Sequence, residues 1–190
     1  MNGLDFVTSE YYIWFLPIVF LLTFTIGQRQ RRRQIGILMV SSYVFFWMAS
    51  GWHMILLLTS TLVDWTAGKK IHHSEDKLIR KRWLIGSLTI NLGLLAIFKY
   101  LDFLIESWNW ASLRISGAPE MDTFGLLLPV GISFYTFQTM SYTIDIYRGK
   151  NKPYDDLLAF SCYAAFFPQL VAGPIVRAEH FRSEVESTLK

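Results

Sequence analysis

The apolar residues of this chain come in long uninterrupted runs, and tight clusters of Arg and Lys flank several of them. Such runs are typical of helices that cross a lipid bilayer, because a crossing of about 30 Å requires roughly 20 apolar residues. The hydrophobic fraction of 52% is also high for a water-soluble domain. The predicted fold class is therefore all-α, a multi-pass transmembrane helical protein with short or re-entrant helices.

The basic clusters at residues 29–33, 69–82 and 148–152 indicate how the chain is oriented. Arg and Lys concentrate in cytoplasmic loops, so all three clusters are assigned to the cytoplasmic side. The N-terminus then lies outside, and the first apolar run is a retained helix instead of a cleaved signal peptide. Because the clusters flank apolar runs, they also argue against nucleic acid as a partner and for the lipid bilayer.

One membrane domain is predicted over residues 1–190. The apolar stretch after the first basic cluster is expected to break near Ser50-Gly51. Its halves would each rise about 22 Å, which favours a tight hairpin or a re-entrant pair; one long tilted helix is the alternative that the charges disfavour. An outer loop is expected at residues 106–122, and whether the last segment crosses or re-enters stays open. The predicted segments cover residues 11–27, 35–49, 52–66, 83–105, 124–147 and 157–172.

Polar residues at membrane depth are candidates for function, because burying them in lipid is costly. Tyr135, Gln138, Tyr142 and Asp145 are spaced three, four and three apart, which places them on one side of a helix. We interpret these four residues and Arg148 as candidates for lining a tunnel or for contacting a donor on the cytoplasmic side. The alternatives are hydrogen bonds between helices and a brace between Asp145 and Arg148.

A second polar set is interpreted as a structural or polar face. Asn91, Lys99, Asp102 and Glu106 fall near one side of the preceding segment, and Lys99 and Asp102 are close enough in sequence to pair. A lysine near a helix end can also reach the interface with its flexible stem. Gln169, in the last apolar segment, belongs to the same group of candidates.

No catalytic residue and no metal site is predicted in this chain. His53 follows the Ser50-Gly51 turn, His72 and His73 lie in a charged cytoplasmic loop, and His180 follows the last apolar segment. None has an evident hydroxyl or carboxylate partner at membrane depth, and all four are interpreted as solvated loop residues. No set of ligands has the spacing of a zinc site. Cys162 is the single cysteine, so it forms no disulfide within the chain.

Two stretches resemble a known family. Residues 128–149 read LPVGISFYTFQTMSYTIDIYRG and residues 166–177 read FFPQLVAGPIVR. Both are similar to consecutive segments of the membrane-bound O-acyltransferases, in the subgroup of the alginate O-acetyltransferase membrane subunit and the D-alanyl transfer protein of teichoic acids. Weaker similarities lie at residues 63–65 and 91–100.

The resemblance implies the N-terminal portion of a helical ring around a tunnel, in a bacterial inner membrane. It implies acetyl transfer from a cytoplasmic donor, acetyl-CoA or another activated acyl carrier, to an exported polysaccharide such as alginate, with no bound cofactor and with an extracytoplasmic acetyltransferase as partner protein. The family's catalytic histidine lies beyond the second motif, so the chain is expected to be truncated before it and inactive alone. The alternatives are a non-catalytic membrane scaffold and a transporter or flippase component.

Overall fold

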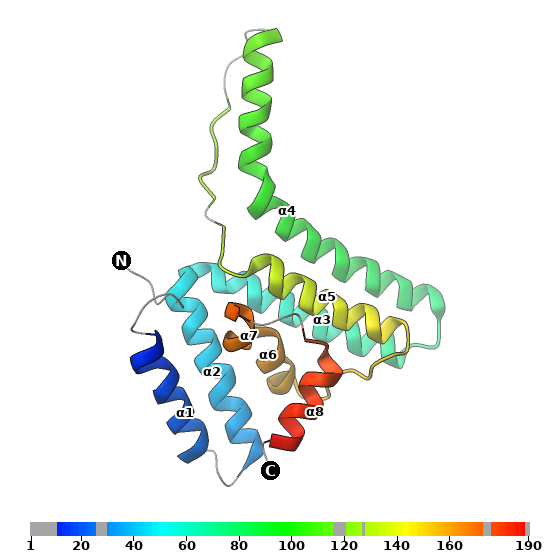
Figure 1. Cartoon of the computed structure of the whole chain (residues 1–190). Coiled ribbons are helices and arrows are strands. Elements are labelled where there is room, and N and C mark those ends of the chain that lie inside the picture. The colour runs from blue at the N-terminus through cyan, green and yellow to red at the C-terminus, as the bar shows by residue number, and fades with distance from the viewer. Residues whose placement is uncertain (1–10, 26–29, 116–120, 127, 173–175, 189–190) are drawn as a thin grey trace.

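The computed structural model describes residues 11–25, 30–115, 121–126, 128–172 and 176–188, and every regular element in these ranges is a helix. Figure 1 shows the helices gathered into a bundle from which part of α4 projects. The predicted all-α class is confirmed. The elements are the π-helical turn η1 (Tyr11–Phe15), α1 (Leu16–Thr25), α2 (Arg31–Ser50), the 3₁₀ turn η2 (Gly51–His53), α3 (Met54–His73), α4 (Lys77–Ile115), α5 (Ile132–Tyr147), α6 (Leu157–Ala165), α7 (Phe167–Ala172) and α8 (Ala178–Thr188).

Gly51 forms a corner between α2 and α3. Its φ of +58° lies in the left-handed region, which glycine adopts without the steric cost of a Cβ. From this corner α2 packs against α1 and α6, whereas α3 packs against α4 and α5 (Figure 1). The chain thus turns where the sequence predicted a break, but the two helices diverge instead of forming a tight hairpin. Both extend past their predicted segments into flanking polar residues.

Helix α4 is much longer than the segment predicted at residues 83–105. It runs for 39 residues, so the predicted outer loop is wrong for residues 106–115. These residues contain neither glycine nor proline, and nothing in them stops a helix. Figure 1 shows α4 bending, with its second half projecting from the bundle. Residues 116–120 of the predicted loop, like residues 26–27 of the first predicted segment, lie outside the described residues.

An extended stretch, residues 121–126, runs back along the projecting half of α4 (Figure 1). Asn109 receives a hydrogen bond from the backbone N–H of Met121 at 2.9 Å and donates to its carbonyl oxygen at 2.8 Å. Asp102 accepts from the N–H of Phe124 at 3.0 Å and from that of Leu126 at 2.7 Å. The Asp102 carboxylate therefore holds backbone groups that have no helix or sheet to satisfy them.

Substituting Asp102→Ala is expected to loosen this stretch. The two amides lose a charged acceptor, and we expect their protection from hydrogen exchange to fall about tenfold, equivalent to about 1.4 kcal/mol. Hydrogen exchange followed by mass spectrometry over peptides 121–126 measures the effect. Asp122→Ala, an exposed carboxylate in the same stretch, is the control and should leave the protection unchanged. Equal loss of protection in both variants would contradict the role of Asp102.

Helix α5 begins later than the segment predicted at residues 124–147. Pro129 lacks a backbone N–H, and Gly131 takes a φ of +72°, which helical residues do not adopt. The N–H of Tyr135 then makes the first hydrogen bond of the helix, to the carbonyl oxygen of Gly131 at 3.0 Å. The apolar composition of residues 124–130 suggested helix, but proline and glycine decide where the helix starts.

The last apolar segment, predicted at residues 157–172, is broken into two short helices. Phe166 has a φ of −56° and a ψ of 99°, which are not helical, and it separates α6 from α7. Pro168 stands in the first turn of α7, where its missing N–H costs nothing. The nine residues of α6 rise about 14 Å, well under half of a hydrocarbon core.

Two helical stretches are long and apolar enough to cross a membrane, Arg31–His73 and Lys77–Arg114. Only 28% and 17% of their most apolar windows are buried inside the structure, so most of this apolar surface faces outward. A core helix of a soluble protein hides such a surface. The two stretches therefore fit a membrane protein, while the number of crossings and the side of the N-terminus stay predictions.

Candidate functional site

A fully buried carboxylate lies where α3, α4 and α5 meet. Asp64 of α3 has no exposed surface. Its Oδ1 accepts hydrogen bonds from the hydroxyl of Ser87 on α4 and from that of Thr143 on α5, the latter at 3.0 Å. Its Oδ2 accepts from Nδ2 of Asn91 at 3.0 Å. Both oxygens of the carboxylate are thus held by neutral donors from two other helices.

The hydrogen bonds continue one helical turn along the bundle. Ser60 Oγ donates to Oδ1 of Asn91 at 2.5 Å and lies 3.1 Å from Oγ1 of Thr139. Each of the three helices contributes two polar residues four positions apart, so that both side chains point the same way. We call this set the polar node; it consists of Ser60 and Asp64 of α3, Ser87 and Asn91 of α4, and Thr139 and Thr143 of α5.

The polar node binds the helices together without a counter-charge. Among the described residues, no Lys, Arg or His pairs with Asp64. Its stability therefore depends on the donors themselves, because a buried carboxylate without them would be very costly. Interhelical hydrogen bonds of this kind fix the mutual rotation of packed helices. The arrangement is suited to keeping three helices in one register.

The sequence analysis singled out Asn91 but missed the other five members of the polar node. The interpretation of Asn91 as a polar-face residue stays a prediction, with its partners now identified. Asp64 lies within residues 63–65, where the similarity to the family was too weak to single it out. The signal that could have found the node is the recurrence of polar pairs at i and i+4 in three apolar segments.

Three of the four residues predicted to lie along one side of α5 are buried: Tyr135, Gln138 and Tyr142. Gln138 donates through Nε2 to the carbonyl oxygen of Tyr163 at 2.9 Å, and Tyr142 Oη accepts from the N–H of Tyr154 at 3.1 Å. The Tyr135 hydroxyl and Gln138 Oε1 are buried and find no hydrogen-bond partner within the part of the chain that the structure describes. The residues face protein, and their role in a tunnel stays a prediction.

The two charged residues at the end of α5 are more accessible. Asp145 is half-buried and Arg148 is exposed, and no ion pair joins these two described side chains. The brace proposed as an alternative is therefore absent. Arg80 of α4 occupies the end of this helix instead, where Nη2 donates to the carbonyl oxygen of Tyr147 at 2.8 Å. Arg148 remains a candidate for contact with a donor.

One predicted polar contact differs from the structure, and the role of one further candidate stays open. No ion pair joins Lys99 and Asp102, which are both described. The Asp102 carboxylate instead accepts hydrogen bonds from the backbone N–H groups of residues 124 and 126. The Lys99 ammonium lies 5.3 Å from the ring centroid of Tyr100. The predicted pair is wrong because unpaired backbone amides are stronger competitors for the carboxylate. Gln169 is buried on α7, and its role stays a prediction.

One histidine does not fit the prediction of solvated loop residues. His53 is buried in η2, where Nδ1 lies 2.8 Å from the carbonyl oxygen of Ser50 and the ring stacks on Trp52 at 4.1 Å between centroids. His72, His73 and His180 are exposed, as expected. No cluster of three or more His, Cys, Asp or Glu side chains that could hold a metal occurs among the described residues.

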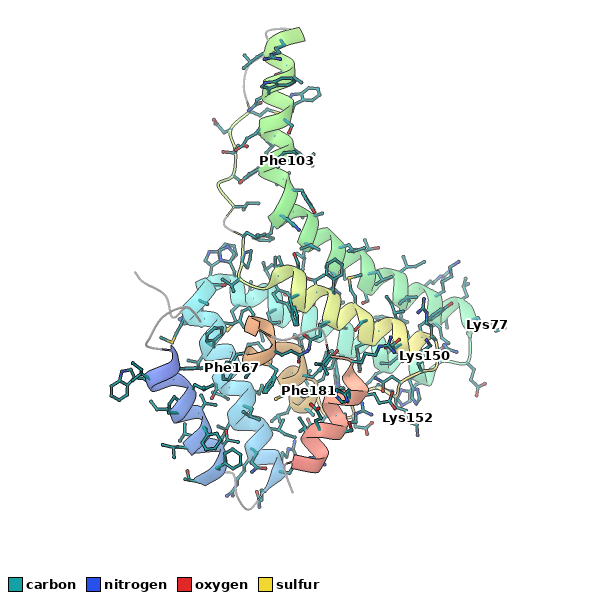
Figure 2. The ribbon with its side chains drawn as sticks, in the orientation of Figure 1. Lys77, Phe103, Lys150, Lys152, Phe167 and Phe181 are labelled. Carbon is teal, nitrogen blue, oxygen red and sulfur yellow. The ribbon has the colours of Figure 1, made fainter. Side chains whose placement is uncertain are left out.

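The basic clusters meet at one end of the structure, which we call the basic end. Arg32, in the first turn of α2, lies 3.6 Å from the Asp156 carboxylate, which brings the first basic cluster to the loop between α5 and α6. The Arg80 contact with Tyr147, the last residue of α5, brings the cluster at the start of α4 to the beginning of the same loop. Figure 2 shows Lys77, Lys150 and Lys152 together at this end. The geometry agrees with a common side for all three clusters.

Comparison with known proteins gives close relatives over nearly the whole chain. The chain is 34% identical over 175 residues to the "probable alginate O-acetylase AlgI" of Pseudomonas aeruginosa, an alignment that covers 90% of the chain and 32% of that protein. It is 32% identical to the protein of the same name from Azotobacter vinelandii, with 90% of the chain and 34% of the relative covered. It is 28% identical to the peptidoglycan O-acetyltransferase of Helicobacter pylori, with 90% and 36% covered.

The chain spans about a third of the length of the curated relatives it matches. No family model and no solved structure matches it. The aligned part nevertheless includes most of the described helices, and the relatives carry the family that the two sequence motifs indicated. Across nearly its whole length, the chain is similar to curated acyltransferases of the membrane-bound O-acyltransferase type, which are named alginate O-acetylase and peptidoglycan O-acetyltransferase.

Proposed function

We propose that this chain takes part in the O-acetylation of hydroxyl groups on a polysaccharide outside the cytoplasm. The observation that carries the proposal is the 34% identity, over 90% of the chain, to a probable alginate O-acetylase. The names of the relatives give alginate and peptidoglycan as acceptors. We take a glycan polymer of this kind as the acceptor.

The proposed topology places the chain in a bacterial inner membrane as a multi-pass protein, with the basic end in the cytoplasm and the N-terminus outside. The convergence of the three basic clusters supports it, because positive residues stay on the cytoplasmic side. The outward-facing apolar surface of α2 to α4 supports contact with lipid. The short α6 and α7 are then re-entrant, since they pack inside the bundle and neither is long enough to cross.

In this arrangement the acetyl group comes from an activated donor in the cytoplasm, acetyl-CoA or another acyl carrier. Arg148, exposed at the end of α5, is the candidate for contact with the donor. Tyr135, Gln138 and Tyr142 follow along the same helix, and a partner acetyltransferase outside the membrane would complete transfer to the polymer. The polar node contributes by holding α3, α4 and α5 in register along this path.

Deletion of the coding sequence in the organism that carries it tests the proposal. We expect the ester-linked acetyl content of the exported polysaccharide or of peptidoglycan to fall to the background level, and the wild-type gene to restore it. Base-released acetate is measured separately in the two polymers, which identifies the acceptor. Unchanged acetate in both polymers would contradict the proposed function.

Complementation with Arg148→Ala tests the donor contact within the same experiment. We expect the restored acetate to fall about tenfold at normal protein levels, because a charge-assisted contact with the donor is lost. Arg114→Ala is the matched control, since Arg114 is also an exposed arginine but lies on the projecting part of α4, far along the chain from the basic end. Equal activity of the two variants would remove Arg148 from the donor site.

A further inference from the structure

A groove of about 540 Å³ opens at the basic end. Three segments that are distant in sequence line it: the end of α3, the loop after α5, and the first half of α8. Figure 2 shows Lys150 and Lys152 in this loop. We call it the basic groove; the residues used below are His72, Lys150, Lys152, Glu179, Arg182 and Ser183.

The framework of the basic groove is fixed by contacts that leave its lysines free. Tyr154 Oη donates to the carbonyl oxygen of Ala178 at 3.0 Å, and Arg182 Nη2 donates to that of Lys152 at 3.0 Å. The Arg182 guanidinium also lies 4.2 Å from the ring centroid of Tyr154. Burial raises the pKa of the Tyr154 phenol, so its hydroxyl stays protonated as a donor. Helix α8 is thereby fastened to the loop that carries the lysines.

The loop itself turns tightly. Gly149 has a φ of +71°, in the region that favours glycine, and the N–H of Lys150 donates to the carbonyl oxygen of Asp145 at 2.9 Å. This closes the C-terminus of α5 and directs the next residues toward α8. The backbone positions of Lys150 and Lys152 are therefore defined even though their side chains are exposed.

The charges of the basic groove are unbalanced. Lys150, Lys152 and Arg182 contribute three positive charges and Glu179 contributes one negative charge, a net charge of +2 with His72 neutral. No described carboxylate lies within ion-pair distance of Lys150 or Lys152. The Ser183 hydroxyl donates its proton to the carbonyl oxygen of His180 at 2.8 Å, so it is not counted as a donor to an anion. Unpaired cations on a fixed framework attract a multivalent anion.

We propose that the basic groove binds a phosphate group at the membrane surface. A phosphate carries close to two negative charges, which matches the net charge of the lining, and lysines bind it as point charges. Two sources share this chemistry: the phosphate of a soluble ester or diphosphate, and the headgroup of an anionic phospholipid, which lies at the level where membrane helices end. The proposal stands independently of acyl transfer.

Binding of inorganic pyrophosphate to the whole chain in uncharged detergent micelles is the first arm of the test. Isothermal titration at low ionic strength compares wild type with the variant Lys150→Ala/Lys152→Ala. The control Lys77→Ala/Lys81→Ala removes the same charge from exposed residues that do not line the groove. We expect the dissociation constant to rise at least tenfold in the groove variant and less than twofold in the control.

Chemical labelling of lysines on the chain in vesicles is the second arm, and it separates the two sources of phosphate. Vesicles of phosphatidylcholine alone are compared with vesicles that contain phosphatidylglycerol. A lipid source predicts that phosphatidylglycerol protects the groove lysines from acetylating reagents in wild type, with Lys77 and Lys81 unprotected; a soluble source predicts protection by pyrophosphate alone. Either pattern supports the proposal. Equal effects in groove and control variants, together with equal labelling of all four lysines, would overturn it.

Discussion

Replacing Asp64 with alanine is expected to lower the free energy of unfolding by about 3 kcal/mol. The substitution removes the acceptor of three buried donors, the Ser87 and Thr143 hydroxyls and Nδ2 of Asn91. Each hydrogen bond lost from a buried donor costs about 1 kcal/mol, the low end of the usual range. Urea unfolding in mixed micelles, followed by circular dichroism, measures the change.

A double variant that exchanges the donor and the acceptor of the Asp64–Asn91 hydrogen bond is expected to restore part of the lost stability. In Asp64→Asn an amide N–H₂ would face Nδ2 of Asn91, and two donors would meet. Adding Asn91→Asp restores an acceptor opposite the new donor and keeps an oxygen for Ser60. The double variant should therefore be more stable than the sum of the two single effects by about 1 kcal/mol or more.

Asp155→Ala is the control for the loss of a carboxylate, because Asp155 is exposed in the loop before α6. Its free energy of unfolding should stay within about 0.5 kcal/mol of wild type. If Asp64→Ala were as mild as this control, the polar node would not be a source of stability. Strictly additive effects of Asp64→Asn and Asn91→Asp would likewise contradict the hydrogen bond between them.

The sequence was sufficient where a local rule decides the structure. The corner at Gly51 follows from a residue that adopts positive φ between two apolar runs, and the basic clusters indicated a common end that the Arg32 and Arg80 contacts now join. Helix limits were less predictable. Hydropathy ended α4 too early, because a helix without glycine or proline continues through polar and aromatic residues after the apolar run is over.

The partners of polar residues could not be predicted from spacing alone. The separation of Lys99 and Asp102 allows a pair, but the choice of Asp102 for the amides of residues 124 and 126 depends on how the chain returns along α4. Asp64, by contrast, was not predicted to form contacts that the structure shows. Its importance comes from donors 23, 27 and 79 residues away in sequence, and only the packing of three helices brings these together.

Substituting Gly68→Ala is expected to destabilise the protein by about 2 kcal/mol, although alanine is the better helix former. A Cβ at Gly68 of α3 would lie 2.9 Å from Cδ1 of Ile146 and 3.0 Å from both Cε1 and Oη of Tyr142 on α5. Overpacking of a close helix contact costs about 1–3 kcal/mol, and Gly68→Val should cost more. Urea unfolding in mixed micelles measures both variants.

The neighbours of Gly68 differ in how easily they can move, and this decides where a rescue is found. Tyr142 is fixed, because its hydroxyl accepts from the N–H of Tyr154 at 3.1 Å and its ring lies 4.5 Å from that of Phe160 between centroids. The Cδ1 of Ile146 is a terminal methyl group, so Ile146→Val removes the shortest contact at a cost of about 1 kcal/mol by itself. The double variant Gly68→Ala/Ile146→Val should recover part of the loss.

Gly86 provides the matched control, since it is also a helical glycine but has open space where a Cβ would be added. Gly86→Ala should leave the protein as stable as wild type or raise its free energy of unfolding by up to about 1 kcal/mol, through helix propensity alone. The two glycines are thus expected to respond to the same substitution with opposite signs. If Gly68→Ala were stabilising like Gly86→Ala, α3 and α5 could not be packed as closely as the 2.9 Å approach requires, and the register that Asp64 and Thr143 share across the same two helices would be wrong as well.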